Sequence, residues 1–435
     1  MYEKFTLPNG VRVVTDKMST VRSASLGVFV GVGSRHETAT LSGAAHFLEH
    51  LAFKGTPTRS AEELAQFMDS AGGQINAYTS NALTCFHGRV VDTRLAEFAE
   101  MLGDITLNSK LDEADIISER SVIDEEIDMY EDSPENVVAE RLMGTVYADT
   151  SLGRSILGTH ETLTKLDEDA LRQFKADRYV GGATVIALAG SFTDEDLKRI
   201  CGIFAKLPSG WGEKYPAVQY NPGRVATNRD IEQVHMALGF PSVSSLDERR
   251  FAMGMLCDIL GGGMSSRLFQ EVREKRGLCY SVYAQNSTYI DTGILTINTA
   301  TNSESQSEML GAIIDELKRF RDNGITEDEL RRERELVSAS VLMSLESSSS
   351  RMSRAGNNEM LHGRIPSTEE TLARFEAVTA QDIAELAEEI LRLDLMSVSI
   401  VGRSVEDDFE ERIAADLRSA ESESTQVEPT SARDA

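Results

Sequence analysis

The sequence is poor in cysteine and has no long hydrophobic run. Its four cysteines lie far apart, without a short pairing motif, at Cys85, Cys201, Cys257 and Cys279. This pattern argues against a disulfide framework and against a zinc ribbon. Apolar stretches such as residues 24–32 are too short to span a bilayer, and no basic segment followed by an apolar one opens the chain. We therefore expect a cytoplasmic protein in a reducing compartment, with no membrane partner.

Basic residues are scarce relative to acidic ones. The chain has 44 lysines and arginines against 71 aspartates and glutamates, which gives a net charge of -27 at pH 7. This charge argues against nucleic acid as a partner and favours basic or neutral substrates, although solubility alone would explain it equally well. A length of 435 residues exceeds a single hydrophobic core, so at least two domains are expected.

Turn signals and apolar patterns predict a mixture of strands and helices. Asn9-Gly10 between two short apolar stretches predicts a β-hairpin, and Ser60 with Glu63 has the spacing of a helix capping box. The predicted elements are a strand at 25–32, a helix around 46–52, a helix from about 60, two strands within 75–91, and helices from 93 to 130 with a break near 108–109.

The two halves of the chain look like copies of each other. At an offset of 214 residues, segment 111–123 matches segment 325–337, and segment 161–190 similarly resembles segment 370–402. A region rich in proline and glycine, residues 206–230, separates the halves. We expect an α+β fold of two duplicated domains, each a mostly antiparallel sheet flanked by helices. The expected division is an N-terminal domain at 1–215, a linker at 216–230, a C-terminal domain at 231–416 and a disordered tail at 417–435.

One motif carries chemistry, the segment His46-Phe47-Leu48-Glu49-His50. On a helix, His46 and His50 are one turn apart and project from the same side, which allows both imidazoles to bind one metal ion. Glu49 falls between them, where a carboxylate can accept a proton from a water on the metal without being a ligand. This order is the inverzincin arrangement. The alternative is an amphipathic helix whose two polar side chains are satisfied by their neighbours.

A catalytic zinc needs a third protein ligand, and the predicted helix at 115–130 offers several carboxylates. These are Glu119, Asp124, Glu125, Glu126 and Asp128. Glu119 and Glu126 are seven residues apart and share one helix face, as expected for one metal ligand and one carboxylate that holds a histidine N–H or the water. In so acidic a chain, however, a solvated helix surface explains any single acidic residue better than metal binding does, unless a family pattern supports the metal site.

The pattern resembles the insulinase and pitrilysin metallopeptidases, which include the mitochondrial processing peptidase. In that family the third zinc ligand is a glutamate at about the separation that Glu126 has from His50, which is 126 − 50 = 76 residues, and another glutamate lies seven residues earlier, as Glu119 does. The resemblance implies one zinc ion per chain, bound by His46, His50 and Glu126, with Glu49 as general base. It covers nearly the whole chain except the tail.

Two further segments match the family pattern. Arg273 and Tyr280, seven residues apart, look like the arginine and tyrosine pair that contacts the substrate carbonyl, although Arg276 and Tyr283 are nearby competitors for these roles. A guanidinium and a phenol are suited to holding a peptide carbonyl and its developing oxyanion.

The other match is the segment 73–79. In the family a similar segment is an edge strand that hydrogen-bonds an extended substrate, which here implicates Asn76 and Ala77. The alternative is an ordinary internal strand.

The resemblance implies a zinc-dependent endopeptidase that hydrolyses oligopeptides or extended precursor segments inside a closed chamber of four such domains. A chain that supplies two domains should therefore form a homodimer, in which Arg273 and Tyr280 act on the zinc site of the partner chain. Acidic walls would favour basic peptides. The alternative function is a non-catalytic structural or partner subunit of a peptidase-like complex, and the presence of the full set of candidate residues argues against it.

Overall fold

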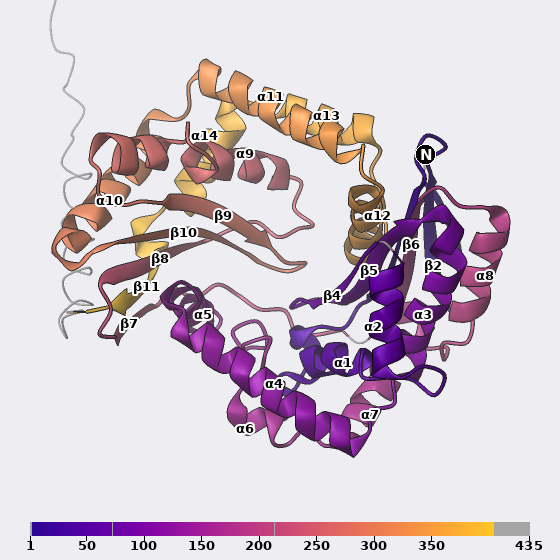
Figure 1. Ribbon diagram of the computed structural model, residues 1–435. Coiled ribbons are helices and arrows are strands. Elements are labelled where there is room, and N and C mark those ends of the chain that lie inside the picture. The colour runs from indigo at the N-terminus through magenta and orange to yellow at the C-terminus, as the bar shows by residue number, and fades with distance from the viewer. Residues whose placement is uncertain (1, 72, 213, 404–435) are drawn as a thin grey trace, which may run out of the picture. The chain divides into compact units, whose positions relative to one another are not determined.

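The computed structural model describes residues 2–71, 73–212 and 214–403 (Figure 1). The predicted tail at 417–435 lies outside these described residues. Within the described part of the chain, no helix combines the length and the apolar character needed to cross a bilayer.

The first sheet has six strands in the spatial order β1-β2-β6-β3-β5-β4. Strands β2 and β6 pair in parallel, and the other neighbours pair antiparallel. The predicted hairpin around Asn9-Gly10 is confirmed, since it joins β1 to β2. The strands are β1 (Glu3–Thr6), β2 (Arg12–Lys17), β3 (Ser23–Val30), β4 (Gln74–Thr79), β5 (Thr84–Val91) and β6 (Thr184–Gly190).

The second sheet repeats this topology with five strands, in the order β7-β11-β8-β10-β9. Again one pair is parallel, β7 with β11, and the rest are antiparallel. The predicted α+β fold with duplicated domains is therefore confirmed. The strands are β7 (Arg224–Asn228), β8 (Gln233–Pro241), β9 (Val282–Thr288), β10 (Gly293–Asn302) and β11 (Ser397–Gly402). Strand β7 falls within the predicted linker at 216–230, which is thus partly sheet.

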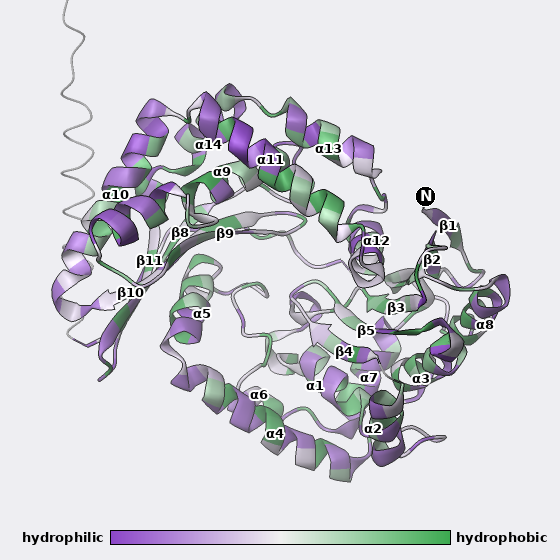
Figure 2. Cartoon of the chain, turned by 45° about the horizontal axis from the view of Figure 1, so that its top comes forward, coloured by the Kyte–Doolittle hydropathy of each residue, from purple (hydrophilic) through white to green (hydrophobic). Residues whose placement is uncertain are grey.

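Helices flank both sheets, and they carry hydrophilic as well as hydrophobic residues along their length (Figure 2). In the first half they are α1 (Ala44–Ala52), α2 (Ala61–Ser70), α3 (Leu95–Asn108), α4 (Glu113–Asp132), α5 (Pro134–Val146), α6 (His160–Leu163), α7 (Glu168–Arg178) and α8 (Asp194–Phe204). In the second half they are α9 (Arg250–Gly261), α10 (Gln306–Asn323), α11 (Glu327–Ser344), α12 (Ser348–His362), α13 (Thr368–Ala377) and α14 (Ala380–Ile390). Helices α4 and α11 begin 327 − 113 = 214 residues apart, the offset seen in the sequence.

The compact units exchange segments between the two halves of the chain. The first unit takes residues up to 130, 149–217 and 334–376, and the second takes 131–148, 218–333 and the described residues from 377 on. Helix α5, from the first half, packs on β8 and β11 of the second sheet, and α12, from the second half, packs on β3 and β6 of the first. Each sheet thus depends on a helix that is distant in sequence.

Helix α12 is held on the first sheet by close packing and by a buried charge. An added Cβ on Gly356 would lie 2.1 Å from the Phe29 ring, so only glycine permits this approach. Glu359 is fully buried, and its carboxylate contacts Lys4 Nζ at 2.8 Å and Arg12 Nη1 at 3.3 Å. Burial makes this charge costly unless both cations stay in place.

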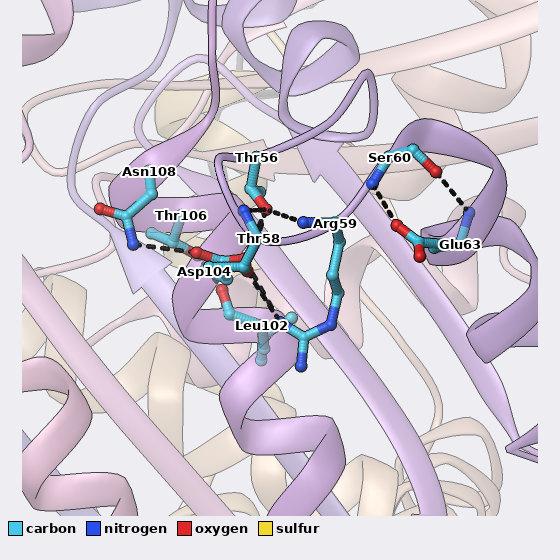
Figure 3. Close-up of polar contacts among 9 residues, drawn as sticks. All are labelled: Thr56, Thr58, Arg59, Ser60, Glu63, Leu102, Asp104, Thr106 and Asn108. Carbon is cyan, nitrogen blue, oxygen red and sulfur yellow. Dashed lines mark hydrogen bonds and ion pairs between the residues drawn. The ribbon is translucent and has the colours of Figure 1, made fainter.

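Polar side chains anchor the loop that follows α1 (Figure 3). Buried Asp104 on α3 accepts hydrogen bonds from the hydroxyls of Thr56, at 2.5 Å, and Thr58. Burial raises the pKa of Asp104, but these hydrogen bonds and one from Asn108 together bring it below its usual value.

The next helix, α2, begins at the predicted capping box, in which Ser60 N–H donates to Glu63 at 2.8 Å and Glu63 N–H donates to the Ser60 hydroxyl at 3.2 Å.

The Glu359 cluster gives a stability prediction. Glu359→Ala leaves Lys4 and Arg12 without their buried partner, so the free energy of unfolding should fall by about 3 kcal/mol in a urea titration. The control is Glu161→Ala, which removes an exposed pair with Lys165 and should leave the free energy of unfolding almost unchanged. Equal, small losses in both variants would show that the buried pair does not hold α12.

Candidate metal centre

The histidine motif lies on α1, a short helix that is almost wholly buried. Its apolar side chains, including Phe47, Leu48 and Leu51, join the core of the first unit. Burial of this face leaves His46 and His50 one turn apart, with their ring centroids 4.5 Å from each other. The helix therefore presents both imidazoles on one side, as the sequence predicts.

Helix α4 brings a carboxylate to the two imidazoles. Glu126 Oε2 lies 3.7 Å from His46 Nε2 and 3.6 Å from His50 Nε2. These distances are too long for hydrogen bonds, but they are close to the separation of roughly 3.3 Å expected between neighbouring ligands of a tetrahedral zinc with bonds of about 2 Å. Among the described residues, these three form the one group of His, Cys, Asp or Glu whose ligand atoms all lie within 4.8 Å of one another.

The other carboxylates of α4 that the sequence left open point elsewhere. Asp124 and Asp128 contact His160, at 2.7 Å and 3.3 Å, and Glu125 is exposed. Glu119 is only 3% exposed and lies 3.1 Å from His50 Nδ1. Such a contact fixes the orientation and the tautomer of a metal-binding imidazole.

The charges of the site fit a divalent cation. Burial, with a smaller contribution from His50, lowers the pKa of His46 to about 3, so this imidazole is neutral and its nitrogen lone pair is available. The carboxylates of Glu49, Glu119 and Glu126 contribute −3, and Lys54, which forms an ion pair with Glu119, contributes +1. With both imidazoles neutral the sum is −2, which one Zn²⁺ would balance. We conclude that the donor set fits zinc.

Glu49 is not part of the group formed by His46, His50 and Glu126 and has a hydrogen-bond partner of its own. The Thr79 hydroxyl, at the end of β4, donates to Glu49 Oε2 at 2.5 Å. Burial raises the pKa of Glu49, whereas the bond from Thr79 lowers it. A half-buried carboxylate with a raised pKa is suited to accepting and returning a proton.

Strand β4 is an edge strand, as the family pattern implies, because it pairs only with β5 in the described sheet. Asn76 is exposed and Ala77 is half-buried. The Ala77 N–H donates to Asn76 Oδ1 at 2.9 Å, so a peptide that adds to this edge at Ala77 has to displace the asparagine side chain.

Arg273 and Tyr280 lie in the second unit. Arg273 belongs to a π-helical segment, Phe269–Lys275, and its guanidinium lies 4.5 Å from the Phe269 ring centroid and 5.2 Å from that of Tyr280. Tyr280 is 82% exposed and borders a pocket of about 180 Å³. The two side chains are thus adjacent and accessible.

Both competitors for these roles have partners of their own. Arg276 forms an ion pair with buried Glu271, at 3.0 Å. The Tyr283 hydroxyl donates to Glu135 at 3.0 Å. Arg273 has only a longer contact with exposed Glu274, at 3.9 Å, so Arg273 and Tyr280 are less engaged by neighbours than their competitors.

Comparison with known proteins decides the family. The family model described as insulinase, peptidase family M16, matches residues 12–160, and the model described as the peptidase M16 inactive domain matches residues 165–337. A protein of Bacillus subtilis named as an uncharacterised zinc protease, YmxG, is 39% identical over 397 residues, which are 91% of this chain and 97% of that protein. The chain belongs to peptidase family M16.

Other M16 relatives agree in length as well as in sequence. An uncharacterised zinc protease of Streptomyces coelicolor is 39% identical over 409 residues, covering 91% of this chain and 88% of that protein. A crystal structure of a peptidase M16 inactive domain from Pseudomonas fluorescens has a TM-score of 0.87 at 19% identity, covering 93% of this chain and 98% of the other. A protease from Helicobacter pylori has a TM-score of 0.85 at 22% identity, covering 92% and 99%. At these identities the two structures establish the M16 fold alone.

The contact between Glu119 and His50 gives a prediction for metal affinity. Glu119→Gln should weaken zinc binding about 10- to 100-fold in a chelator competition, because loss of a hydrogen-bonded carboxylate beside a ligand has effects of this size. Glu125→Gln makes the same chemical change on the exposed face of α4 and should leave the affinity unchanged. Equal affinities of the two variants would contradict the orienting role.

Proposed function

We propose that this chain is a zinc-dependent endopeptidase that hydrolyses oligopeptides or extended precursor segments. The single observation that carries the proposal is that His46, His50 and Glu126 come together, with Glu49 directly before His50 on the same helix. The names given to two M16 relatives, both uncharacterised zinc proteases by name, support it. One zinc ion per chain is expected.

Zinc, when bound, would polarise the scissile carbonyl and lower the pKa of a water to about 7. The chain's own residues would do the rest. Glu49, whose Oε2 is held by Thr79, accepts the proton of the attacking water on Oε1 and then returns it to the leaving amine nitrogen. Glu119 keeps His50 oriented throughout, and Lys54 balances the charge of Glu119.

Substrate binding is assigned to the edge strand and to the arginine and tyrosine pair. An extended peptide adds to β4 at Asn76 and Ala77 through its main chain, which gives weak sequence selectivity. Arg273 and Tyr280 hold the carbonyl and stabilise the oxyanion that develops on it. The net charge of -27 favours basic peptides.

The proposed assembly is a homodimer that encloses its substrate in a chamber, with Arg273 and Tyr280 acting on the zinc site of the partner chain.

A cytoplasmic location remains a prediction from the sequence. The alternative function is a non-catalytic subunit of a peptidase-like complex, and the complete set of candidate side chains argues against it.

The direct test is zinc content together with cleavage of a quenched peptide library. Glu49→Gln should retain one zinc per chain and lose nearly all turnover, about 10²-fold or more, because only the proton acceptor is removed. Glu62→Gln, at an exposed position on α2, is the matched control and should cleave like the wild type. Zinc without cleavage in the wild type would favour the subunit role, and substantial turnover by Glu49→Gln would refute the role of Glu49.

The action of Arg273 and Tyr280 across chains can be tested by complementation. A heterodimer of Glu49→Gln and Tyr280→Phe chains, purified with two different tags, has one site that combines Glu49 with Tyr280 only if these residues come from different chains. About half of the wild-type activity should then return, since one of the two sites is complete. Activity no higher than that of the two homodimeric variants would place Tyr280 and Glu49 in the same chain's site.

A further inference from the structure

A buried glutamate closes the first turn of the metal-binding helix. Glu37 follows β3, is 5% exposed and lies six residues before Gly43, the N-cap residue of α1. Its Oε2 accepts a hydrogen bond from Gly43 N–H at 2.9 Å, and its Oε1 accepts one from Ala45 N–H at 2.8 Å. Both oxygens of one carboxylate therefore bind the amino terminus of α1, where free N–H groups and the helix dipole favour negative charge.

The helix has no cap of its own. Its N-cap residue is Gly43, which has φ +95° and no side chain to accept a hydrogen bond. A Cβ at this position would lie 2.7 Å from the Leu157 carbonyl oxygen, so a serine or an aspartate could not take its place. The first turn thus relies on Glu37, which is contributed by a different segment.

The loop that carries Glu37 is also fixed to the end of the edge strand. Ser34 N–H donates to the Ser80 carbonyl at 3.2 Å, Arg35 N–H donates to the Asn81 carbonyl at 2.9 Å, and the Asn81 amide donates to the Ser34 hydroxyl at 3.1 Å. Ser80 directly follows Thr79, which binds Glu49. One short loop therefore connects the end of β4 with the beginning of α1.

Two arginines support the loop. The Arg154 guanidinium donates to the Glu37 backbone carbonyl at 2.5 Å. Burial raises the pKa of Glu37 to about 8, whereas the two N–H groups of α1 and the charges of Arg154 and Arg178 oppose this rise. Despite this burial, the carboxyl group has a specific pair of partners, the two N–H groups of α1.

We propose that Glu37 is a positioning residue for the metal centre, which fixes the height and orientation of α1 against β4 so that His46 and His50 meet Glu126. This inference rests on the proposed function, since it assumes that zinc binds at this group. A positioning role and a merely structural role can be distinguished by measuring metal binding. A structural residue would change the stability of the fold, whereas a positioning residue also changes metal affinity and ligand geometry.

The test compares Glu37→Gln with the wild type in two measurements on the full chain. Zinc affinity from chelator competition should fall about 10- to 100-fold, the range seen when groups that orient metal ligands are lost. With cobalt in place of zinc, the visible absorption of the wild type should have the intensity of a tetrahedral site, and that of the variant should change in position or strength. Glutamine keeps the size of the side chain, but its amide group has to face an N–H donor.

Glu63→Ala is the matched control, because Glu63 binds the amino terminus of α2, which carries no candidate ligand. It should leave zinc affinity and the cobalt spectrum unchanged even if the melting temperature falls. If Glu37→Gln does not fold, Glu37→Asp, which keeps the carboxyl group but is shorter, is measured in its place with the same expectation. Affinity within twofold of the wild type and an unchanged spectrum, whatever the melting temperature, would overturn the inference. Absence of zinc binding by the wild type would instead refute the proposed function.

Discussion

Two imidazoles and three carboxylates share the small space between α1 and α4, and the charge of this group constrains its surroundings. Lys54 offsets only one of the negative charges, and burial keeps His46 from taking up a proton. A divalent cation would balance the remaining charge of −2. Three contacts are made within or beside this group: Glu119 lies 3.1 Å from His50 Nδ1, the Thr79 hydroxyl donates to Glu49, and Glu37 accepts two hydrogen bonds from the first turn of the helix that carries both histidines.

The duplication allows equivalent positions of the two halves to be compared. The two sheets share one strand order, and α4 and α11 occupy equivalent places, with Glu119 matched by Glu333 at the offset of 214. In the second unit, buried Glu333 contacts Asp258 of α9 rather than a histidine, and burial together with this like charge raises the pKa of Glu333 to about 7. The same scaffold thus holds a pair of carboxyl groups where the first unit holds the contact between Glu119 and His50.

Local patterns predicted the local structure well. The turn at Asn9-Gly10, the capping box at Ser60 and Glu63 and the spacing of His46 and His50 all depend on residues within one turn or one hairpin, and the structure has each of them. The grouping of Glu126 with the histidines depended on the family pattern, because spacing alone could not choose among the carboxylates of α4.

The contacts between residues far apart in the chain could not be predicted from the sequence. Nothing in the pattern around Lys54, Thr79 or Glu37 indicates that these side chains meet the motif, since their partners are set by how loops and strands pack. The exchange of α5 and α12 between the units and the place of β7 in the second sheet have the same origin. A prediction from composition alone therefore assigned residues 216–230 to a linker.

The most direct test of this account is a crystal structure with anomalous diffraction data at the zinc absorption edge. The account predicts one peak per chain, about 2.0–2.1 Å from Nε2 of His46 and of His50 and about 2.0–2.2 Å from a carboxylate oxygen of Glu126. It also predicts that Glu49 stays outside the coordination shell. A peak bound by Glu119 or Glu49 in place of Glu126, or no peak at this group in crystals grown with zinc, would contradict it.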